Sequence, residues 1–245
     1  MSNIVAFFDI DGTIYREGLI TELCKKLIKY EMIDQARWEQ HIKPAYLKWA
    51  KRQGEYDTYL LTMVDVYTEA VKGLSPYHME YIAKKVIDQK GDRVYTFSRD
   101  RIKWHKERGH KVVAISGSPI ELVREMSNKY QLDDYRGTIY QKDDTGKYTG
   151  NVIPMWDAVS KKQAILEMVE KYDIDLTKSY AYGDTAGDFT MLSMVGKPFA
   201  INPTKELLSQ ICTDEKLAEK AVIIVERKDM IYKLRPHQLN VVVVE

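Results

Sequence analysis

Short strand-like segments recur along this chain, and stretches with helical periodicity separate most of them. The strand-like segments are residues 4–8, 111–116, 137–141, 147–152, 179–184, 198–202 and 221–225. Several are continuous apolar runs rather than alternating ones, which is typical of strands buried on both faces. Helical patterns lie at residues 98–108, 119–130, 161–172, 186–195 and 204–219. This alternation predicts an α/β fold, a Rossmann-like doubly wound parallel sheet with helices on both faces.

The segment from residue 16 to residue 90 departs from this alternation. It contains no convincing strand and several amphipathic helical stretches, one of which places Leu19 and Leu23 on the same face. The sequence therefore predicts an all-helical domain at residues 16–90, inserted after the first strand. Residues 1–15 and 91–245 would together form the Rossmann-like core.

Composition and charge exclude several classes of protein. The 245 residues include 37 Lys and Arg against 36 Asp and Glu, so the charge balance favours neither a nucleic-acid nor a membrane partner. Cys24 and Cys212 lie far apart and fit a reducing compartment. Asp9 interrupts the first apolar run, so no signal peptide is expected, and no run reaches the ~18 residues of a membrane span. We expect a cytoplasmic protein.

Two carboxylates stand directly after the first predicted strand. In the segment IVAFFDIDGT the apolar run ends at Asp9 and Asp11. Ligands of open parallel sheets bind at the carboxyl ends of the strands. Two carboxylates so close together repel each other, and Mg²⁺, which prefers oxygen ligands, would compensate the repulsion. Gly12 and Thr13 follow and predict a turn whose backbone N–H groups face an anion.

Residues of matching chemistry follow two further predicted strands. SGSP places Ser116 at a strand end and Pro119 at a helix start, where free backbone N–H groups favour phosphate. YGDTAGD places Asp184 just after a strand and Asp188 one helical turn later. Between these two segments, SKKQAI opens a helix with lysine. Together these residues predict a site for phosphate and magnesium.

These motifs resemble those of the haloacid dehalogenase superfamily, on its phosphatase side. All four family motifs match in order: DIDGT, ISGS, Lys161 ahead of a helix, and GDTAGD. Lys162 is the neighbouring alternative, and the spacing to Ile165 favours Lys161. The resemblance extends from Val5 to about Pro203, and RGTIYQKDDTGKYTGNV and VGKPFAINP are similar to the phosphoserine phosphatase-like branch, subfamily IB. It implies that the helical insertion is a C1-type cap that closes over the site.

The resemblance also implies a role for each motif residue. Asp9 would be the nucleophile that forms an aspartyl-phosphate, and Asp11 would protonate the leaving oxygen and then activate water. Lys161 would neutralise charge between Asp9 and the phosphate, and Ser116 completes the catalytic set. The residues implied in phosphate binding are Gly12, Thr13, Ser116, Gly117 and Lys161, and those implied in binding Mg²⁺ are Asp9, Asp184, Asp188 and, through its backbone carbonyl, Asp11.

The expected function is Mg²⁺-dependent hydrolysis of a small phosphorylated metabolite. Phosphoserine is one candidate, but phosphoserine phosphatases have a Glu for the substrate amine where an ungapped alignment places Gly18, with Glu17 one position early. Residues 53–92 contain no Arg for the substrate carboxylate, and the aligned position holds Tyr67 or Thr68. These departures favour another, or a broader, substrate.

The sequence leaves two other functions open. A phosphotransferase or mutase would use the same four motifs and pass the phosphoryl group to a sugar, so phosphate release must be compared with transfer to added alcohols or sugars. A catalytically silent phosphate-binding regulator would keep the fold without turnover, and the complete set of acidic residues argues against it. Trp156, just before the helix of Lys161, is a candidate for substrate contact.

The end of the chain lies beyond the resemblance. The run Val241–Val244 has strong strand character. It predicts pairing at a sheet edge, either within the chain or with a second copy in a homodimer.

Overall fold

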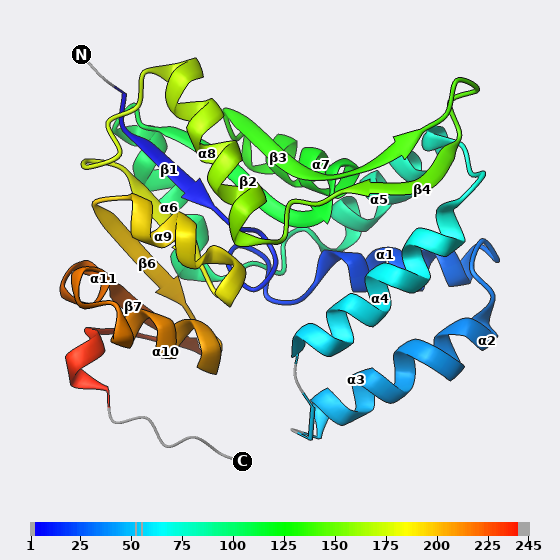
Figure 1. Cartoon of the computed structure of the whole chain (residues 1–245), viewed down its shortest axis with the longest axis horizontal. Helices are drawn as coiled ribbons and strands as arrows, with labels where there is room; N and C mark the ends of the chain where they lie inside the picture. The colour runs from blue at the N-terminus through cyan, green and yellow to red at the C-terminus, as the bar shows by residue number, and fades with distance from the viewer. Residues whose placement is uncertain (1–2, 52, 55, 240–245) are drawn as a thin grey trace.

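The computed structural model of the chain describes residues 3–51, 53–54 and 56–239 (Figure 1). Within them lies one eight-stranded sheet. Its strands, in order across the sheet, are β4 (Tyr148–Ile153), β3 (Asp134–Lys142), β2 (Lys111–Pro119), β1 (Val5–Phe8), β5 (Tyr180–Gly183), β6 (Lys197–Ile201), β7 (Val222–Arg227) and β8 (Met230–Leu234). The strands from β3 to β7 run parallel, and β4 and β8 are antiparallel edges. The predicted α/β class and doubly wound sheet are confirmed.

Helices connect most of the strands. The first group is α1 (Leu19–Lys29), α2 (Gln35–Arg37), a π-helical turn (Trp38–Ile42), α3 (Lys43–Ala50), α4 (Tyr56–Val71) and α5 (Pro76–Lys90). The second group is α6 (Thr96–Glu107), α7 (Ile120–Tyr130), α8 (Ala158–Tyr172), a 3₁₀ turn (Ala186–Asp188), α9 (Phe189–Met194), α10 (Lys205–Thr213), α11 (Glu215–Lys220) and a 3₁₀ turn (Pro236–Gln238). None of the helices in the described ranges is long and apolar enough to cross a membrane.

Buried apolar side chains cover both faces of the sheet. Every residue of β1 is buried, and successive residues point to opposite faces. Phe7 belongs to a cluster with Ile165 of α8 and Leu207 of α10. Phe8 belongs to a second cluster that includes Leu122 of α7 and continues into α1, α4 and α5. This burial explains why the central strands are apolar without alternation.

The stretch predicted to be all-helical contains α1 to α5 and no strand among its described residues. In α1 the spacing of Leu19, Leu23 and Leu27 buries one face of the helix. Figure 1 shows α1 to α4, in blue to cyan, gathered to one side of the sheet, and α5 packs against α7. The domain boundaries near residues 16 and 90 stay a prediction.

Two predictions for the C-terminal part are wrong in detail. The helix predicted at residues 204–219 is divided into α10 and α11, because Asp214 ends the first and its Oδ1 accepts a hydrogen bond from the backbone N–H of Leu217, at 2.9 Å, to cap the second. β8 is absent from the predicted strands, although it pairs with β7; its apolar residues Met230, Ile231 and Tyr232 are exposed, and it has no buried run. The strand predicted at Val241–Val244 lies outside the described residues.

Candidate active site

The sequence-predicted site residues meet at the centre of the sheet, where the strand order reverses. Asp9 directly follows β1, Asp184 directly follows β5, and Ser116 lies in the last part of β2. Because β1 pairs with both β2 and β5 in parallel, the carboxyl ends of these strands lie side by side. Lys161 reaches the same point from the first turn of α8 and is 2% exposed. Segments far apart in the sequence therefore build one site.

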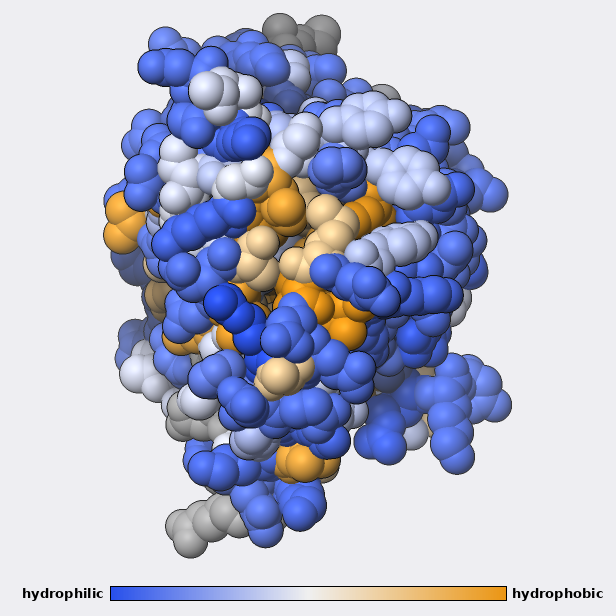
Figure 2. Space-filling view, turned by 90° about the vertical axis from the view of Figure 1, so that its right-hand side faces the viewer, coloured by the Kyte–Doolittle hydropathy of each residue, from blue (hydrophilic) through white to orange (hydrophobic). Residues whose placement is uncertain are grey.

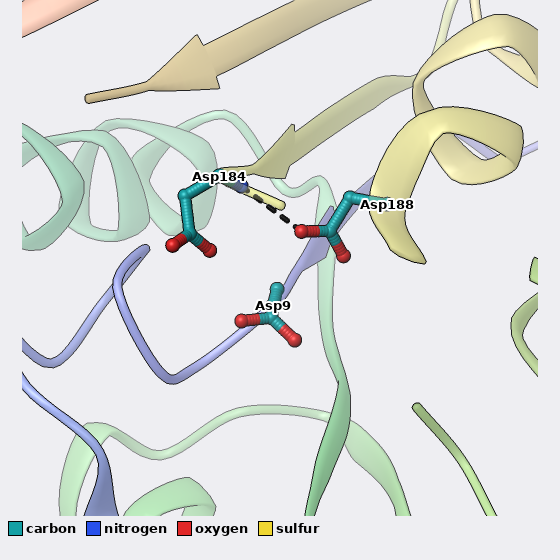
Figure 3. A group of neighbouring side chains, drawn as sticks. All are labelled: Asp9, Asp184 and Asp188. Carbon is teal, nitrogen blue, oxygen red and sulfur yellow. Dashed lines mark hydrogen bonds between the residues drawn. The ribbon is translucent and has the colours of Figure 1, made fainter. Parts of the chain in front are cut away.

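Three aspartates and one lysine form what we name the charged floor: Asp9, Asp184, Asp188 and Lys161. Figure 3 shows the three carboxylates converging from the end of β1, the end of β5 and the turn before α9. One oxygen of each lies within 4.8 Å of the others. Lys161 Nζ donates hydrogen bonds to Asp9 Oδ1 at 2.7 Å and to Asp188 Oδ1 at 2.5 Å. The ammonium group thus bridges two carboxylates.

Negative charge exceeds positive charge on the charged floor. Burial raises the pKa of Asp9 well above its ordinary value, and Lys161 offsets only part of this effect. Burial, and then repulsion from Asp188 and Asp9, raise the pKa of Asp184 well above its ordinary value. Burial disfavours the charged form of Lys161, but Asp188 and Asp9 outweigh it and raise the pKa of the lysine. One further positive charge would favour the ionised form of every carboxylate here.

The oxygen atoms that remain available suit a hard divalent cation. Among the described residues, no donor forms a hydrogen bond with Asp9 Oδ2 or Asp184 Oδ2, whereas both oxygens of Asp188 are engaged. Asp188 Oδ2 accepts hydrogen bonds from the backbone N–H groups of Asp184 at 2.9 Å and Thr185 at 3.1 Å. Two available carboxylates in a site with excess negative charge fit Mg²⁺. Asp188 anchors Lys161 and the loop after β5.

Asp11 lies in a separate hydrogen-bond network beside the charged floor. Its Oδ2 accepts hydrogen bonds from Ser118 Oγ at 2.6 Å and Ser116 Oγ at 3.3 Å, and its Oδ1 accepts one from the backbone N–H of Leu19 at 2.6 Å. The first residue of α1 is thereby tied to Asp11. The motif SGSP contains Ser118 as well as Ser116, and no role is predicted for Ser118. Residues two apart in an extended segment face the same side, and this spacing is the signal that both hydroxyls reach Asp11.

Gly12 and Thr13 position Asp184. Gly12 has φ +77°, and a Cβ there would lie 1.9 Å from Asp184 Oδ2, so both backbone conformation and space exclude a side chain. The buried Thr13 hydroxyl donates a hydrogen bond to Asp184 Oδ1 at 3.0 Å. The segment DIDGT therefore shapes the carboxylate that follows β5, a relation that the sequence does not reveal.

A cluster of aromatic and basic side chains lies behind the charged floor. Tyr182 of β5 stacks on Phe8 of β1 with ring centroids 4.0 Å apart. The Tyr182 hydroxyl accepts a hydrogen bond from Arg101 Nε at 3.0 Å and lies 2.9 Å from His105 Nε2. His105 Nδ1 lies 2.9 Å from His110 Nδ1. Burial, followed by the charges of Arg101 and His110, lowers the pKa of His105 to about 2. The imidazole therefore stays neutral under the strands that carry Asp9 and Asp184.

A cavity of about 310 Å³ adjoins Asp9, Asp11 and Lys161. The residues that we name the apolar wall line its opposite side: Ile20 of α1 and Leu60, Leu61 and Val64 of α4. Gly117, Ser118 and Trp156 also line it. Figure 2 shows the side of the molecule on which α1 and α4 lie, with apolar side chains gathered in the middle of hydrophilic ones.

The cavity receives no charged side chain from the positions that align with the substrate-binding residues of phosphoserine phosphatases. Gly18 is the N-cap residue of α1. Tyr67 is 1% exposed and packs edge-on against Tyr140, with ring centroids 4.9 Å apart. The Thr68 hydroxyl donates to the backbone carbonyl of Val64 at 2.7 Å. Of the described residues that line the cavity, Lys161 alone is cationic.

Comparison with known proteins places these observations in a family. The model of the haloacid dehalogenase-like hydrolase family matches residues 6–193. A Streptomyces azureus protein named "Inhibition of morphological differentiation protein" is 28% identical over 204 residues, which cover 82% of this chain and 73% of that protein. A histidinol-phosphatase of Neisseria meningitidis is 24% identical over 216 residues, which cover 84% of this chain and 93% of that protein.

A solved structure supports the same fold. A phosphoserine phosphatase in complex with its substrate superposes with a TM-score of 0.61 and 21% identity, over 94% of this chain and 95% of that one. The predicted resemblance to the phosphoserine phosphatase-like branch is thus confirmed at the level of the fold.

Proposed function

The chain belongs to the haloacid dehalogenase-like hydrolase family, and we propose that it is a Mg²⁺-dependent phosphatase that hydrolyses a small phosphomonoester through an aspartyl-phosphate on Asp9. The observation that carries this proposal is the buried Lys161, which contacts Asp9 and Asp188 at the carboxyl end of β1. Phosphoryl transfer depends mainly on positioning and on charge neutralisation. This arrangement supplies a positioned carboxylate and a fixed cation.

We assign the first step to Asp9. A carboxylate oxygen of Asp9 bonds to phosphorus while the bond from phosphorus to the leaving alcohol oxygen breaks. Lys161 favours the ionised form of Asp9, although burial outweighs this effect, and it faces the incoming negative charge. The Ser116 hydroxyl and the backbone N–H of Gly117 would hold the phosphoryl oxygens. The sequence-based prediction that the Gly12 N–H binds phosphate is wrong, because this group donates to the Tyr15 carbonyl at 2.8 Å and stabilises the turn.

We assign proton transfer to Asp11. Its carboxyl group gives a proton to the leaving oxygen, and in the second step it takes a proton from the water that attacks phosphorus and breaks the bond to Asp9. Burial raises the pKa of Asp11, which favours the protonated form that a general acid needs. Ser118 and the backbone N–H of Leu19 orient this carboxyl group. The products are the alcohol and inorganic phosphate.

The residues that would hold Mg²⁺ are Asp9, Asp184 and the backbone carbonyl of Asp11, with Asp188 behind them. When bound, the ion would supply positive charge to the transferring phosphoryl group. The excess of negative charge on the charged floor supports this assignment.

We propose that residues 16–90 are a cap domain over a core formed by residues 1–15 and 91–245. The two sides of the cavity come from different parts of the chain. The apolar wall comes from α1 and α4, whereas Asp9 and Lys161 come from the end of β1 and from α8, and this difference supports the boundary. A small phosphorylated metabolite fits a cavity of about 310 Å³.

The test is phosphate release from a panel of phosphomonoesters with Mg²⁺ and with a chelator. We expect activity that requires the metal and that falls by about 10³-fold or more in Asp9→Asn. Asp100→Asn is the matched control, because the Asp100 side chain is 65% exposed on α6. Mass spectrometry of acid-quenched enzyme should find phosphate on the peptide that contains Asp9.

Three results would contradict the proposal. Folded protein that releases no phosphate across the panel would exclude a general phosphatase. Activity that survives in Asp9→Asn would exclude the assigned nucleophile. Preferential transfer to added alcohols or sugars would identify a phosphotransferase instead.

A further inference from the structure

The cavity offers no charge partner for an anionic group on the substrate beyond the phosphate itself. Lys161 is the one cationic residue among its described lining residues, and Asp9 and Asp188 already engage it. The apolar wall contributes only hydrocarbon surface. An anion placed against it would lose water without gaining a partner, which is strongly unfavourable.

Negative charge on the rim of the cavity adds to this effect. Asp157 lines the cavity and is the N-cap residue of α8, where it accepts hydrogen bonds from Ser160 and Val159. Partial burial raises the pKa of Asp157, but the hydrogen bonds from Ser160 and Val159 outweigh it and lower the pKa below its ordinary value. The side chain is therefore ionised at neutral pH and repels a second anion.

Trp156 provides a flat apolar surface beside Lys161. A Cβ at Gly117 would lie 2.8 Å from Trp156 Cβ, and one at Gly187 would lie 2.4 Å from the Trp156 carbonyl oxygen. Both glycines thus allow Trp156 to pack directly against the catalytic loops. Its indole N–H makes no hydrogen bond with any described residue, so this edge can serve a ligand.

Cationic side chains gather instead in a second cavity of about 920 Å³, on the other side of Gly12 and Asp184. Neither Asp9, Asp11 nor Lys161 lines it. Its arginines are engaged by carboxylates, Arg16 with Glu226 at 3.0 Å and Arg93 with Glu17 at 2.6 Å. The leaving oxygen must lie beside Asp11, so the leaving group occupies the first cavity.

We propose that the substrate is the phosphate ester of an alcohol with an apolar, preferably aromatic, body and no carboxylate, and that Trp156 and the apolar wall select it. This inference rests on the proposed phosphatase function. It excludes phosphoserine as the preferred substrate, although the fold is that of phosphoserine phosphatases. Trp156 packs against the ring or hydrocarbon body, and the apolar wall covers the opposite side.

The experiment compares kcat/KM for phenyl phosphate, 4-carboxyphenyl phosphate and phosphoserine with the Mg²⁺-loaded enzyme. We expect phenyl phosphate to be preferred by about 100-fold over its carboxylated analogue, the size of effect that an unpaired buried charge produces. The para-carboxylate does not make the phenol a poorer leaving group, so slower turnover would come from the binding site.

Two variants and one control test which residues select the substrate. Leu61 is 51% exposed on the apolar wall, and Leu61→Lys should narrow the preference at least tenfold by raising kcat/KM for the carboxylated ester. Leu166→Lys, the same change at a 45% exposed position of α8 outside the cavity, should leave the ratio unchanged. Trp156→Ala should raise KM for phenyl phosphate about tenfold more than it raises KM for methyl phosphate.

Equal efficiency with both phenyl esters, or a preference for phosphoserine, would overturn this inference and leave the phosphatase function standing. A preference that responds equally to Leu61→Lys and Leu166→Lys would also overturn it. Folded enzyme that hydrolyses no phosphomonoester would overturn both the inference and the function on which it rests.

Discussion

On one side of the cavity lie Asp9 and Lys161, the part of the charged floor that lines it, with Asp184 and Asp188 beside them. On the other side the chain places four aliphatic side chains, supplied by α1 and α4. The charged floor is held by directional hydrogen bonds, such as those from Lys161 to Asp9 and Asp188 at 2.7 and 2.5 Å. The apolar wall makes no such bonds to the reacting groups.

This difference between charged and aliphatic surfaces corresponds to two tasks of the site, catalysis and substrate selection. Buried charges are stabilised only by particular partners at short distance, so a change on the charged floor leaves an unpaired charge behind. Aliphatic contacts are non-directional and scale with area, so the apolar wall tolerates substitution and can change its selectivity. On the proposed function, the chemistry of the site depends on the charged floor, and its choice of substrate depends on the apolar wall.

The largest expected effect is that of Lys161→Met. The change leaves Asp9 and Asp188 facing each other without their cation, so kcat should fall about 10³-fold and the free energy of unfolding by about 3 kcal/mol. Steady-state kinetics and chemical denaturation measure the two effects. Lys162→Met, at the exposed neighbouring position, is the control and should change neither. Equal losses in both variants would mean that Lys161 has no special place on the charged floor.

A smaller effect is expected for Gly12→Ala. Its Cβ would collide with Asp184 Oδ2, so we expect about 10–100-fold weaker activation by Mg²⁺, measured by titrating activity with the metal. Gly109→Ala separates this collision from backbone strain, because Gly109 has φ +67° and no atom within 4 Å of the added Cβ. That control should lose about 1 kcal/mol of stability and keep the wild-type response to Mg²⁺. Identical metal titrations for the two variants would refute the positioning role of Gly12.

Acidic pH should lower the free energy of unfolding because of His105, which lies behind the charged floor. The pKa of this imidazole is about 2 in the folded protein against 6.5 for the unfolded chain, because of burial and of the nearby Arg101, His110, Arg108 and Lys197. The unfolded state therefore binds the proton first, and stability should fall by about 1.4 kcal/mol per pH unit below about pH 6.5. Denaturation curves between pH 7.5 and about 4.5 measure the slope.

A variant separates the contribution of His105 to the pH dependence of stability from that of other titrating groups. Asp9 and Asp184 have raised pKa values, which act in the opposite direction as pH falls. The stability of His105→Gln should depend less steeply on pH than that of the wild type. His41→Gln, at an exposed position, should show the wild-type slope. Parallel curves for wild type and His105→Gln would disprove the assignment.

The smallest expected effect is that of Ser118→Ala. It removes the 2.6 Å hydrogen bond to Asp11 Oδ2 but leaves Ser116 and the Leu19 N–H in place. We expect kcat/KM to fall about fivefold, equivalent to about 1 kcal/mol. Ser127→Ala is the control, because Ser127 Oγ is buried without a hydrogen-bond partner among the described residues. An unchanged kcat/KM in Ser118→Ala would show that Ser116 and the Leu19 N–H are sufficient to orient Asp11.

Much of the candidate site could be predicted because strand ends are recognisable in a sequence. Asp9, Ser116 and Asp184 each follow or end an apolar run, and parallel strands bring such ends together. Lys161 was separable from Lys162 only by its motif spacing. His105 and Glu226 could not be found in this way. Glu226, for example, accepts hydrogen bonds from Thr96 and Phe97 across 130 and 129 residues of chain.

The sequence by itself determined the α/β class, the helical insertion and the identity of the residues at the carboxyl ends of the central strands. Periodicity and the order of short motifs carry this information because both depend on neighbours along the chain. Only the tertiary structure decided that Gly12 must make room for Asp184, that Asp188 engages Lys161, and that α4 supplies an apolar wall. These relations depend on distances between segments that are remote in sequence, and close packing rather than local preference sets such distances.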